Sequence, residues 1–333
     1  MADTTSRLPL PLGEGVRTPP PRPGGGARTR RPVHGVLLLD KPIGLSSNDA
    51  LQRAKRLYRA EKAGHTGTLD PLATGLLPLC FGAATKFSQA SLDADKRYLA
   101  TLQLGVRTTT GDAEGEVVER REVNVDLDQM RAACARFTGP IRQLPPMHSA
   151  LKHQGRALYS YARAGIEVER EARAVTVHAI DIVDGADDRW TLDVRCSKGT
   201  YIRTLAEDIG AALGCGAHLA GLRRTASGPL QIANAVTLAQ LEAMSEAERD
   251  AALHDPDSLL ADAPLVRLDS DEAGRFLSGL RRRLDAADAA VVRVYGPEAK
   301  AFLGSGHIAA GELISTRLLS PIEVQSLVLT PRA

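Results

Sequence analysis

An aspartate in a glycine-rich stretch is the first candidate for a catalytic group. Residues 64–75 read GHTGTLDPLATG, and Asp70 is the only acid among them. The glycines allow backbone conformations that other residues avoid, and Pro71 restricts Asp70 to an extended conformation. A rigid loop that presents one carboxylate could serve acid–base or nucleophilic catalysis. Turn chemistry by itself favours the alternative that Asp70 hydrogen-bonds only its own backbone.

Other glycine, serine and cysteine patterns do not complete a chemical site. No lysine follows Gly67, so the stretch is not a P-loop, and neither Gly214/Gly216 nor Gly304/Gly306 has the third glycine of a dinucleotide fingerprint. No serine stands in a GxSxG elbow. The four cysteines form no CxxC pair and no zinc-ligand spacing with histidine, so we interpret them as reduced and structural. We therefore expect no metal and no cofactor.

The composition is that of an ordinary globular protein. Of the 333 residues, 43% are hydrophobic and 25% are charged, and the length suggests roughly two domains. No apolar run is long enough to span a bilayer, and the N-terminus lacks the apolar core of a signal peptide. We expect a cytoplasmic protein that does not enter a membrane.

The first 33 residues differ from the rest of the chain. They hold seven prolines, three consecutive glycines, and six arginines against two acids, a net charge of 6 − 2 = +4. Such a segment buries too little apolar surface to offset its ordering entropy, so residues 1–33 are predicted to be a disordered basic tail. Because the whole chain carries +2, residues 34–333 carry 2 − 4 = −2, and any nucleic-acid surface must be a local patch.

The remaining sequence mixes helical and strand patterns without a steady βαβ rhythm. Helices are predicted after Ser46 or Ser47 and over 126–137 and 200–213, and strands over 35–40, 98–104, 175–183 and 190–196. This mixture indicates an α+β fold with a mixed or antiparallel sheet. A domain boundary is predicted near 250–262, an acidic, alanine-rich stretch, with a small β-rich domain after it.

Six stretches, in order along the chain, resemble the TruB-type pseudouridine synthases. GHTGTLDPLATG resembles the catalytic motif of that family. The other five stretches are LLLDKPIGLSSNDA (37–50), DKRYLATLQLG (95–105), PPMHSALKHQGRALYSYARAG (145–165), CSKGTYIRTLAEDIG (196–210) and GAHLAGLRR (216–224). One short glycine motif would be weak evidence, but six in sequence are highly specific.

The resemblance implies a domain plan and an activity. It predicts a pseudouridine-synthase catalytic domain over 34–252, an RNA-gripping insertion at about 142–165, and a C-terminal PUA-like RNA-binding domain over 262–333. The activity implied is isomerisation of uridine to pseudouridine at position 55 in the T-loop of tRNA, by flipping the base and rearranging its glycosidic bond. The family needs no cofactor, and we expect a monomer that needs no protein partner.

The resemblance also implies roles for individual residues. Asp70 would be the essential catalytic carboxylate, Arg203 would pair with it and hold it ionised, and Tyr98 would stack on the flipped uracil. The remaining residues would line or support the same site: Tyr201 and Leu222 in the pocket, Lys41 nearby, and His65 where the base leaves its loop. Taken singly, these residues have ordinary alternatives, such as a solvated lysine or a buried strand tyrosine.

The chemical step is open at the level of sequence. A carboxylate could trap an oxocarbenium-like ribose, as in retaining glycosidases, attack C6 of the base, or abstract a proton from the sugar. A base stacked in a loop must in every case be extruded first, which costs a few kcal/mol.

The basic residues indicate where RNA would bind. The stretch 139–165 contains no acid, and it holds Arg142, Lys152 and Arg156 as candidate RNA contacts. Arg223 and Arg224 follow Leu222 and are interpreted as part of the same surface. Two alternatives remain: a non-catalytic tRNA-binding or tRNA-folding module, and a guide-RNA-dependent synthase of the same family. The insertion at 145–165 and the lack of a long basic C-terminal extension favour the stand-alone bacterial enzyme.

Overall fold

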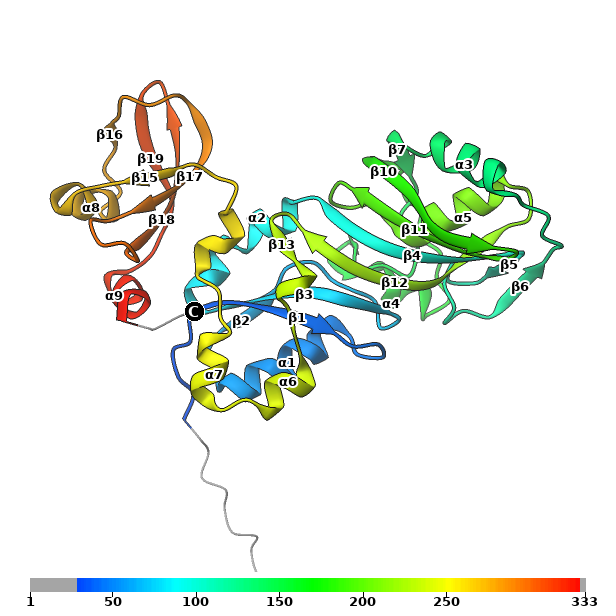
Figure 1. Cartoon of the computed structure of the whole chain (residues 1–333), viewed down its shortest axis with the longest axis horizontal. Coiled ribbons are helices and arrows are strands. Elements are labelled where there is room, and N and C mark those ends of the chain that lie inside the picture. Colours follow the sequence, from blue (N-terminus) through cyan, green and yellow to red (C-terminus); the bar gives the residue numbers. More distant parts are fainter. Residues whose placement is uncertain (1–28, 330–333) are drawn as a thin grey trace, which may run out of the picture.

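Two β-sheets organise the chain (Figure 1). The computed structural model describes residues 29–329. A ten-stranded sheet fills most of the molecule, and a five-stranded sheet forms its C-terminal part. Helices pack on both sheets, so the predicted α+β class is confirmed.

The large sheet is mixed. Its main path runs, in spatial order, through β14 (Val236–Thr237), β1 (Gly35–Lys41), β3 (Ala73–Phe81), β12 (Ala217–Ser227), β4 (Lys96–Leu104), β11 (Arg189–Cys196), β10 (Arg173–Ala186) and β7 (Gly139–Gln143). Short strands β2 (Ala63–His65) and β13 (Leu230–Gln231) pair with β3 and β12. The β1–β14 and β3–β12 pairs are parallel and the other pairs are antiparallel. Strand β12 therefore lies between β3 and β4, which come from two different sequence stretches.

Helices cover the sheet in two groups (Figure 1). Helices α5 (Ile202–Ala212) and α3 (Leu127–Arg136) pack near β4, β10 and β12, while α1 (Ser47–Tyr58) and α6 (Leu238–Ala243) pack near β1. Ser46 is the N-cap of α1, because its side chain accepts a hydrogen bond from the Asp49 amide. Helix α5 begins at Ile202, two residues later than predicted, and Tyr201 is its N-cap residue.

Shorter elements complete the large domain. They are α2 (Ser88–Asp93), α4 (Leu158–Ala162), α7 (Glu246–Ala251), the 3-10 turns η1 (Gly82–Phe87), η2 (Ile232–Asn234) and η3 (Pro256–Leu260), and the hairpins β5 (Val106–Thr108) with β6 (Val117–Arg120) and β8 (Lys152–His153) with β9 (Arg156–Ala157). The β8–β9 hairpin and α4 lie within the acid-free insertion.

The C-terminal sheet has the order β15 (Leu265–Arg267), β17 (Ala289–Tyr295), β18 (Phe302–Ala309), β19 (Glu312–Leu318) and β16 (Arg282–Arg283). Helices α8 (Ser270–Leu277) and α9 (Pro321–Leu329) belong to this part. It packs on the large domain through the rings of Phe87 and Phe302, whose centroids lie 5.1 Å apart, and through the Lys86–Glu323 ion pair. The segment at which the sequence predicts a boundary is itself packed, with Leu259 buried in this contact.

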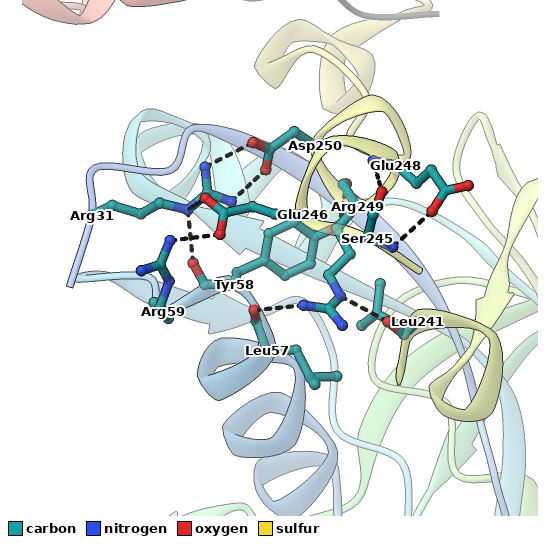
Figure 2. A network of polar contacts seen from close by, with 10 residues as sticks. All are labelled: Arg31, Leu57, Tyr58, Arg59, Leu241, Ser245, Glu246, Glu248, Arg249 and Asp250. Carbon is teal, nitrogen blue, oxygen red and sulfur yellow. Dashed lines mark hydrogen bonds and ion pairs between the residues drawn. The ribbon is translucent and has the colours of Figure 1, made fainter. Parts of the chain in front are cut away.

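Ordered structure begins earlier than the sequence predicts. Figure 2 shows Arg31 paired with Asp250 at the end of α7, with Nη1 2.7 Å from Oδ2. Val33 is buried in the core beside Tyr58. The predicted limit of the disordered tail at residue 33 is therefore wrong, because an ion pair and apolar burial order the end of that segment. The rest of the predicted tail, residues 1–28, lies outside the described residues.

Candidate active site

The loop that carries Asp70 is fixed at both ends. It leaves β2 at His65 and enters β3 at Ala73. The Ser47 side chain, at the start of α1, donates to the Leu69 carbonyl at 3.0 Å and accepts from the Leu69 amide at 2.8 Å. Gly67 has φ +88°, a conformation that favours glycine. Asp70 is thus presented by a loop that is held to both a helix and a strand.

Arg203 joins Asp70 to a second carboxylate. Its Nη2 lies 3.0 Å from Asp70 Oδ2, and its Nη1 lies 3.5 Å from Asp112 Oδ2. The same guanidinium donates to the carbonyls of Thr110 and His148. The Arg203 and Asp112 side chains are only 7% and 5% exposed, whereas Asp70 is 42% exposed. Asp70 is therefore the member of this group that faces open space.

The surroundings shift the ionisation of Asp70. Burial of the carboxyl raises its pKa above the ordinary value, and the neighbouring Arg203 guanidinium opposes that rise. Nearby Asp112 adds to the rise because two negative charges repel. Arg203 therefore favours the ionised form of Asp70, as expected. Its effect is smaller than that of burial, so the pKa of Asp70 still lies above the usual range.

A cleft of about 240 Å³ opens beside Asp70. The candidates Tyr98, Tyr201, Arg203 and Leu222 line it together with Asp70, although they come from three separate stretches of sequence. Tyr98 on β4 and Leu222 on β12 also pack against two of the hydrophobic clusters of the large domain. The cleft therefore joins one carboxylate and one cation to an aromatic and aliphatic wall.

A second hollow of about 500 Å³ adjoins the cleft at Asp70 and Arg203. His65 lines it, and so do Asp112 and Glu114. Burial lowers the pKa of His65, and the Arg224 guanidinium adds to that effect, so the neutral imidazole is favoured. The His65 Nδ1 atom is buried and has no hydrogen-bond partner within the described part of the chain.

Lys41 lies behind the site rather than in it. It is the last residue of β1 and is fully buried, so the alternative of a solvated lysine is wrong. Its Nζ donates to the carbonyls of Leu45 and Pro42, at 2.6 and 3.0 Å. Burial lowers the pKa of Lys41 to about 8, and its charge still acts on Asp70. The lysine supports the loop between β1 and α1.

Three residues that sequence reasoning missed belong to this site. Asp112 carried no motif signal. Arg224 was interpreted as part of a basic surface, but it is 1% exposed and lines the cleft, as does buried Lys96. Both cations could have been predicted from strand alternation, because side chains two residues apart lie on the same face of a strand. Arg224 therefore shares a face with Leu222, and Lys96 shares a face with Tyr98.

The candidate RNA contacts lie outside the cleft. Lys152 and Arg156 lie on the β8–β9 hairpin and are exposed, and the Arg156 guanidinium lies 4.8 Å from the Tyr161 ring centroid. Arg142 on β7 donates to the Ala172 carbonyl at 2.8 Å. Arg223 is paired with Asp40, its Nη2 lying 2.7 Å from Oδ2. Arg223 is therefore partly neutralised, unlike the hairpin cations.

No other kind of site is found in residues 29–329. Within that range, no group of three or more histidine, cysteine, aspartate or glutamate side chains could hold a metal ion. The four cysteines are free thiols, and all are buried. Among the same residues, no helix is both long and apolar enough to cross a membrane.

Comparison with known proteins gives three family matches along the chain. Residues 55–202 match "TruB family pseudouridylate synthase (N terminal domain)", residues 203–291 match "tRNA pseudouridylate synthase B C-terminal domain", and residues 264–319 match "Pseudouridine synthase II TruB, C-terminal". All three descriptions are of pseudouridine synthases. The chain belongs to the TruB family.

Similar proteins of the same name come from several bacteria. The chain is 60% identical over 306 residues to "tRNA pseudouridine synthase B" of Verminephrobacter eiseniae, covering 90% of this chain and 92% of that one. It is 61% identical to the protein of that name from Cupriavidus pinatubonensis, covering 87% and 95%.

Solved structures share the fold at lower identity. The chain matches one from "Crystal Structure of a Cbf5-Nop10-Gar1 Complex" with a TM-score of 0.66 and 26% identity, over 86% of this chain and 84% of that one. It matches one from "Structure of H/ACA RNP bound to a substrate RNA containing 2'-deoxyuridine" with the same TM-score and 23% identity, over 87% and 86%. The latter likeness shows the fold alone.

Proposed function

We propose that this protein isomerises uridine to pseudouridine at position 55 in the T-loop of tRNA, with Asp70 as the catalytic carboxylate. The observation that carries the proposal is the pairing of Asp70 with Arg203 at a cleft whose wall includes Tyr98 and Leu222. Family membership and about 60% identity to proteins named tRNA pseudouridine synthase B support the same reaction and substrate.

The chemistry suits a site with one exposed carboxylate. The N1–C1′ bond of uridine breaks, the uracil rotates within the cleft, and C5 joins C1′. The proton that C5 loses in forming this bond is balanced by the proton that N1 gains. Asp70 can stabilise or trap the electron-poor ribose, or act on the base or on a sugar proton. The uracil is retained as the group that re-attaches, so no second carboxylate has to activate a water.

Access to the base requires extrusion from the T-loop. We assign Tyr98 to stack on the flipped uracil and Tyr201 and Leu222 to bound the same cleft. His65, at the adjoining hollow, would occupy the space that the base leaves. The cations of the β8–β9 hairpin would hold the phosphates of the stem and loop.

We further propose that the protein acts alone, as a cytoplasmic monomer without a guide RNA or a cofactor. Identity supports this choice, because the chain is about 60% identical to bacterial proteins named for tRNA but only 23% and 25% identical to two chains from H/ACA complexes. The acid-free insertion supplies an RNA-binding surface within the same chain.

The test is to incubate the purified protein with an unmodified tRNA transcript and no added cofactor, and then to map pseudouridine by mass spectrometry. We expect conversion at U55, and none in a transcript with cytidine at that position. Tight tRNA binding without conversion would favour the non-catalytic module. Conversion that appears only after guide RNA and partner proteins are added would favour the guide-dependent branch.

A further inference from the structure

A guanidinium is buried beneath the cleft and has no carboxylate partner. Arg224 is 1% exposed, yet within residues 29–329 it forms no ion pair. Its Nε donates to the Leu76 carbonyl at 2.7 Å, and its Nη2 donates to the Gly67 carbonyl at 3.1 Å. Burying a charge without a counter-ion costs free energy of folding, so we ask what Arg224 contributes at the cleft.

Arg224 and Tyr98 are neighbours on adjacent strands. They stand directly opposite each other in the β12–β4 register, and both line the cleft. The two side chains are close enough for the guanidinium charge to act on the phenol. Burial raises the pKa of Tyr98, and the Arg224 charge opposes that rise. Tyr98 therefore stands beside a cation that two main-chain carbonyls fix in place.

The same side chain also reaches the loop that carries Asp70. Gly67 lies in that loop, and a Cβ built there would stand 3.3 Å from Arg224 Nη1, so the guanidinium packs directly against the glycine. On the other side, Arg224 pairs with Gly75 of β3, where a Cβ would collide with the arginine backbone. One residue thus connects the strand of Tyr98 to both ends of the catalytic loop.

We propose that Arg224 is a positioning residue for the isomerisation, holding the Tyr98 hydroxyl in a fixed place relative to Asp70 through the Gly67 carbonyl. This inference rests on the proposed function, because it assigns Arg224 to the same cleft and reaction. The fork of a guanidinium can serve two carbonyls and a phenol together, whereas a lysine ammonium lacks that planar geometry.

The test is a double-mutant cycle of Arg224→Lys and Tyr98→Phe, read by single-turnover rate with saturating enzyme and by tRNA affinity. We expect Arg224→Lys alone to slow the chemical step about 10- to 100-fold with little change in affinity, since it weakens bonds to a charged donor. Tyr98→Phe should also slow that step, because it removes the hydroxyl that Arg224 holds. In the Tyr98→Phe background, Arg224→Lys should then have almost no further effect on the rate.

The matched control is Arg249→Lys. Figure 2 shows that Arg249 also donates to main-chain carbonyls, those of Leu57 and Leu241, but lies at α7 and outside the cleft. Arg249→Lys should lower the melting temperature without changing the single-turnover rate. If Arg224→Lys and Arg249→Lys lower the melting temperature by similar amounts but only Arg224→Lys slows the reaction, the loss of stability does not explain the slower rate.

Two results would overturn the inference, one from the mutant cycle and one from NMR. Rate losses that multiply in the double variant would mean that Arg224 acts without Tyr98. If the wild-type protein makes no pseudouridine, the proposed function fails as well, whereas multiplying losses in an active enzyme reject only this inference. If Arg224→Lys does not fold, NMR of wild-type protein with labelled tyrosine and arginine replaces the cycle. The Tyr98 ring, assigned with Tyr98→Phe, must then show contact with a guanidinium, and no contact rejects the inference.

Discussion

The Arg203 guanidinium lies against the Asp70 carboxylate, with Nη2 3.0 Å from Oδ2, while its other terminal nitrogen turns toward buried Asp112. One cation therefore serves two acids of unequal exposure. Asp112 anchors the arginine from within the protein, and Asp70 keeps a face toward the cleft. This division leaves Asp70 oriented but available to substrate.

The neighbours of Asp70 should set the acid limb of the pH–rate profile. A reaction that needs ionised Asp70 slows as the pH falls through the pKa of that residue. Asp112 raises this pKa and Arg203 lowers it. We expect Asp112→Asn to move the acid limb to lower pH and Arg203→Gln to move it to higher pH, both with reduced rates. Identical limbs in all three proteins, measured under single-turnover conditions, would show that Asp70 ionisation does not control the rate.

Asp70→Asn should abolish turnover while leaving tRNA affinity largely intact, because phosphate contacts dominate binding. The raised pKa in the folded state means that ionised Asp70 opposes folding at neutral pH. We therefore expect the melting temperature of the variant at pH 7 to equal or exceed that of the wild type. Multiple turnover by Asp70→Asn, with wild-type contamination excluded by mass spectrometry, would disprove the catalytic assignment.

Lys41 should make stability depend on alkaline pH. Its pKa is about 8 in the folded protein, below the ordinary value of about 10.4, so the unfolded chain binds more protons between these limits. The contribution of Lys41 to stability should rise as the pH increases from 8 toward 10.4. We expect the melting temperature of the wild type, relative to Lys41→Met, to rise between pH 7.5 and 9.5, values chosen to span about this window. Exposed Lys62→Met is the control, and a constant difference for Lys41→Met would contradict this account.

The β8–β9 hairpin should contribute more to tRNA affinity than the N-terminal segment. We expect Lys152→Ala/Arg156→Ala to bind tRNA more weakly and with a shallower salt dependence, since each lost phosphate contact reduces the slope of log affinity against log salt by roughly 0.7–0.9. The control is Lys55→Ala/Arg56→Ala, which removes two cations from α1.

Deletion of residues 1–28 should reduce non-specific attraction at most, because that segment lies outside the family resemblance. Modification at the same uridine should persist. If the deletion abolishes activity while the hairpin variant retains wild-type affinity across the salt series, the RNA surface has been assigned to the wrong part of the chain.

The sequence by itself determined the elements whose signals are local. The apolar run 35–40 became β1, Ser46 capped α1, and Asp126 capped α3 through a capping box with Gln129. The conformational freedom of the glycines around Asp70 and the restricted backbone before Pro71 could also be predicted from the sequence. Each of these signals involves residues within a few positions of one another, so no distant partner is needed to interpret them.

The tertiary structure alone decided which charged side chains are buried. Arg223 and Arg224 look alike in sequence, yet one pairs with Asp40 at the surface and the other lies beneath the cleft. Strand alternation puts consecutive residues on opposite faces, but only the register of β12 between β3 and β4 decides which face meets Tyr98 and the Asp70 loop. Asp112 reaches Arg203 in the same way, through contacts between segments that are distant in sequence, and no local pattern encodes those contacts.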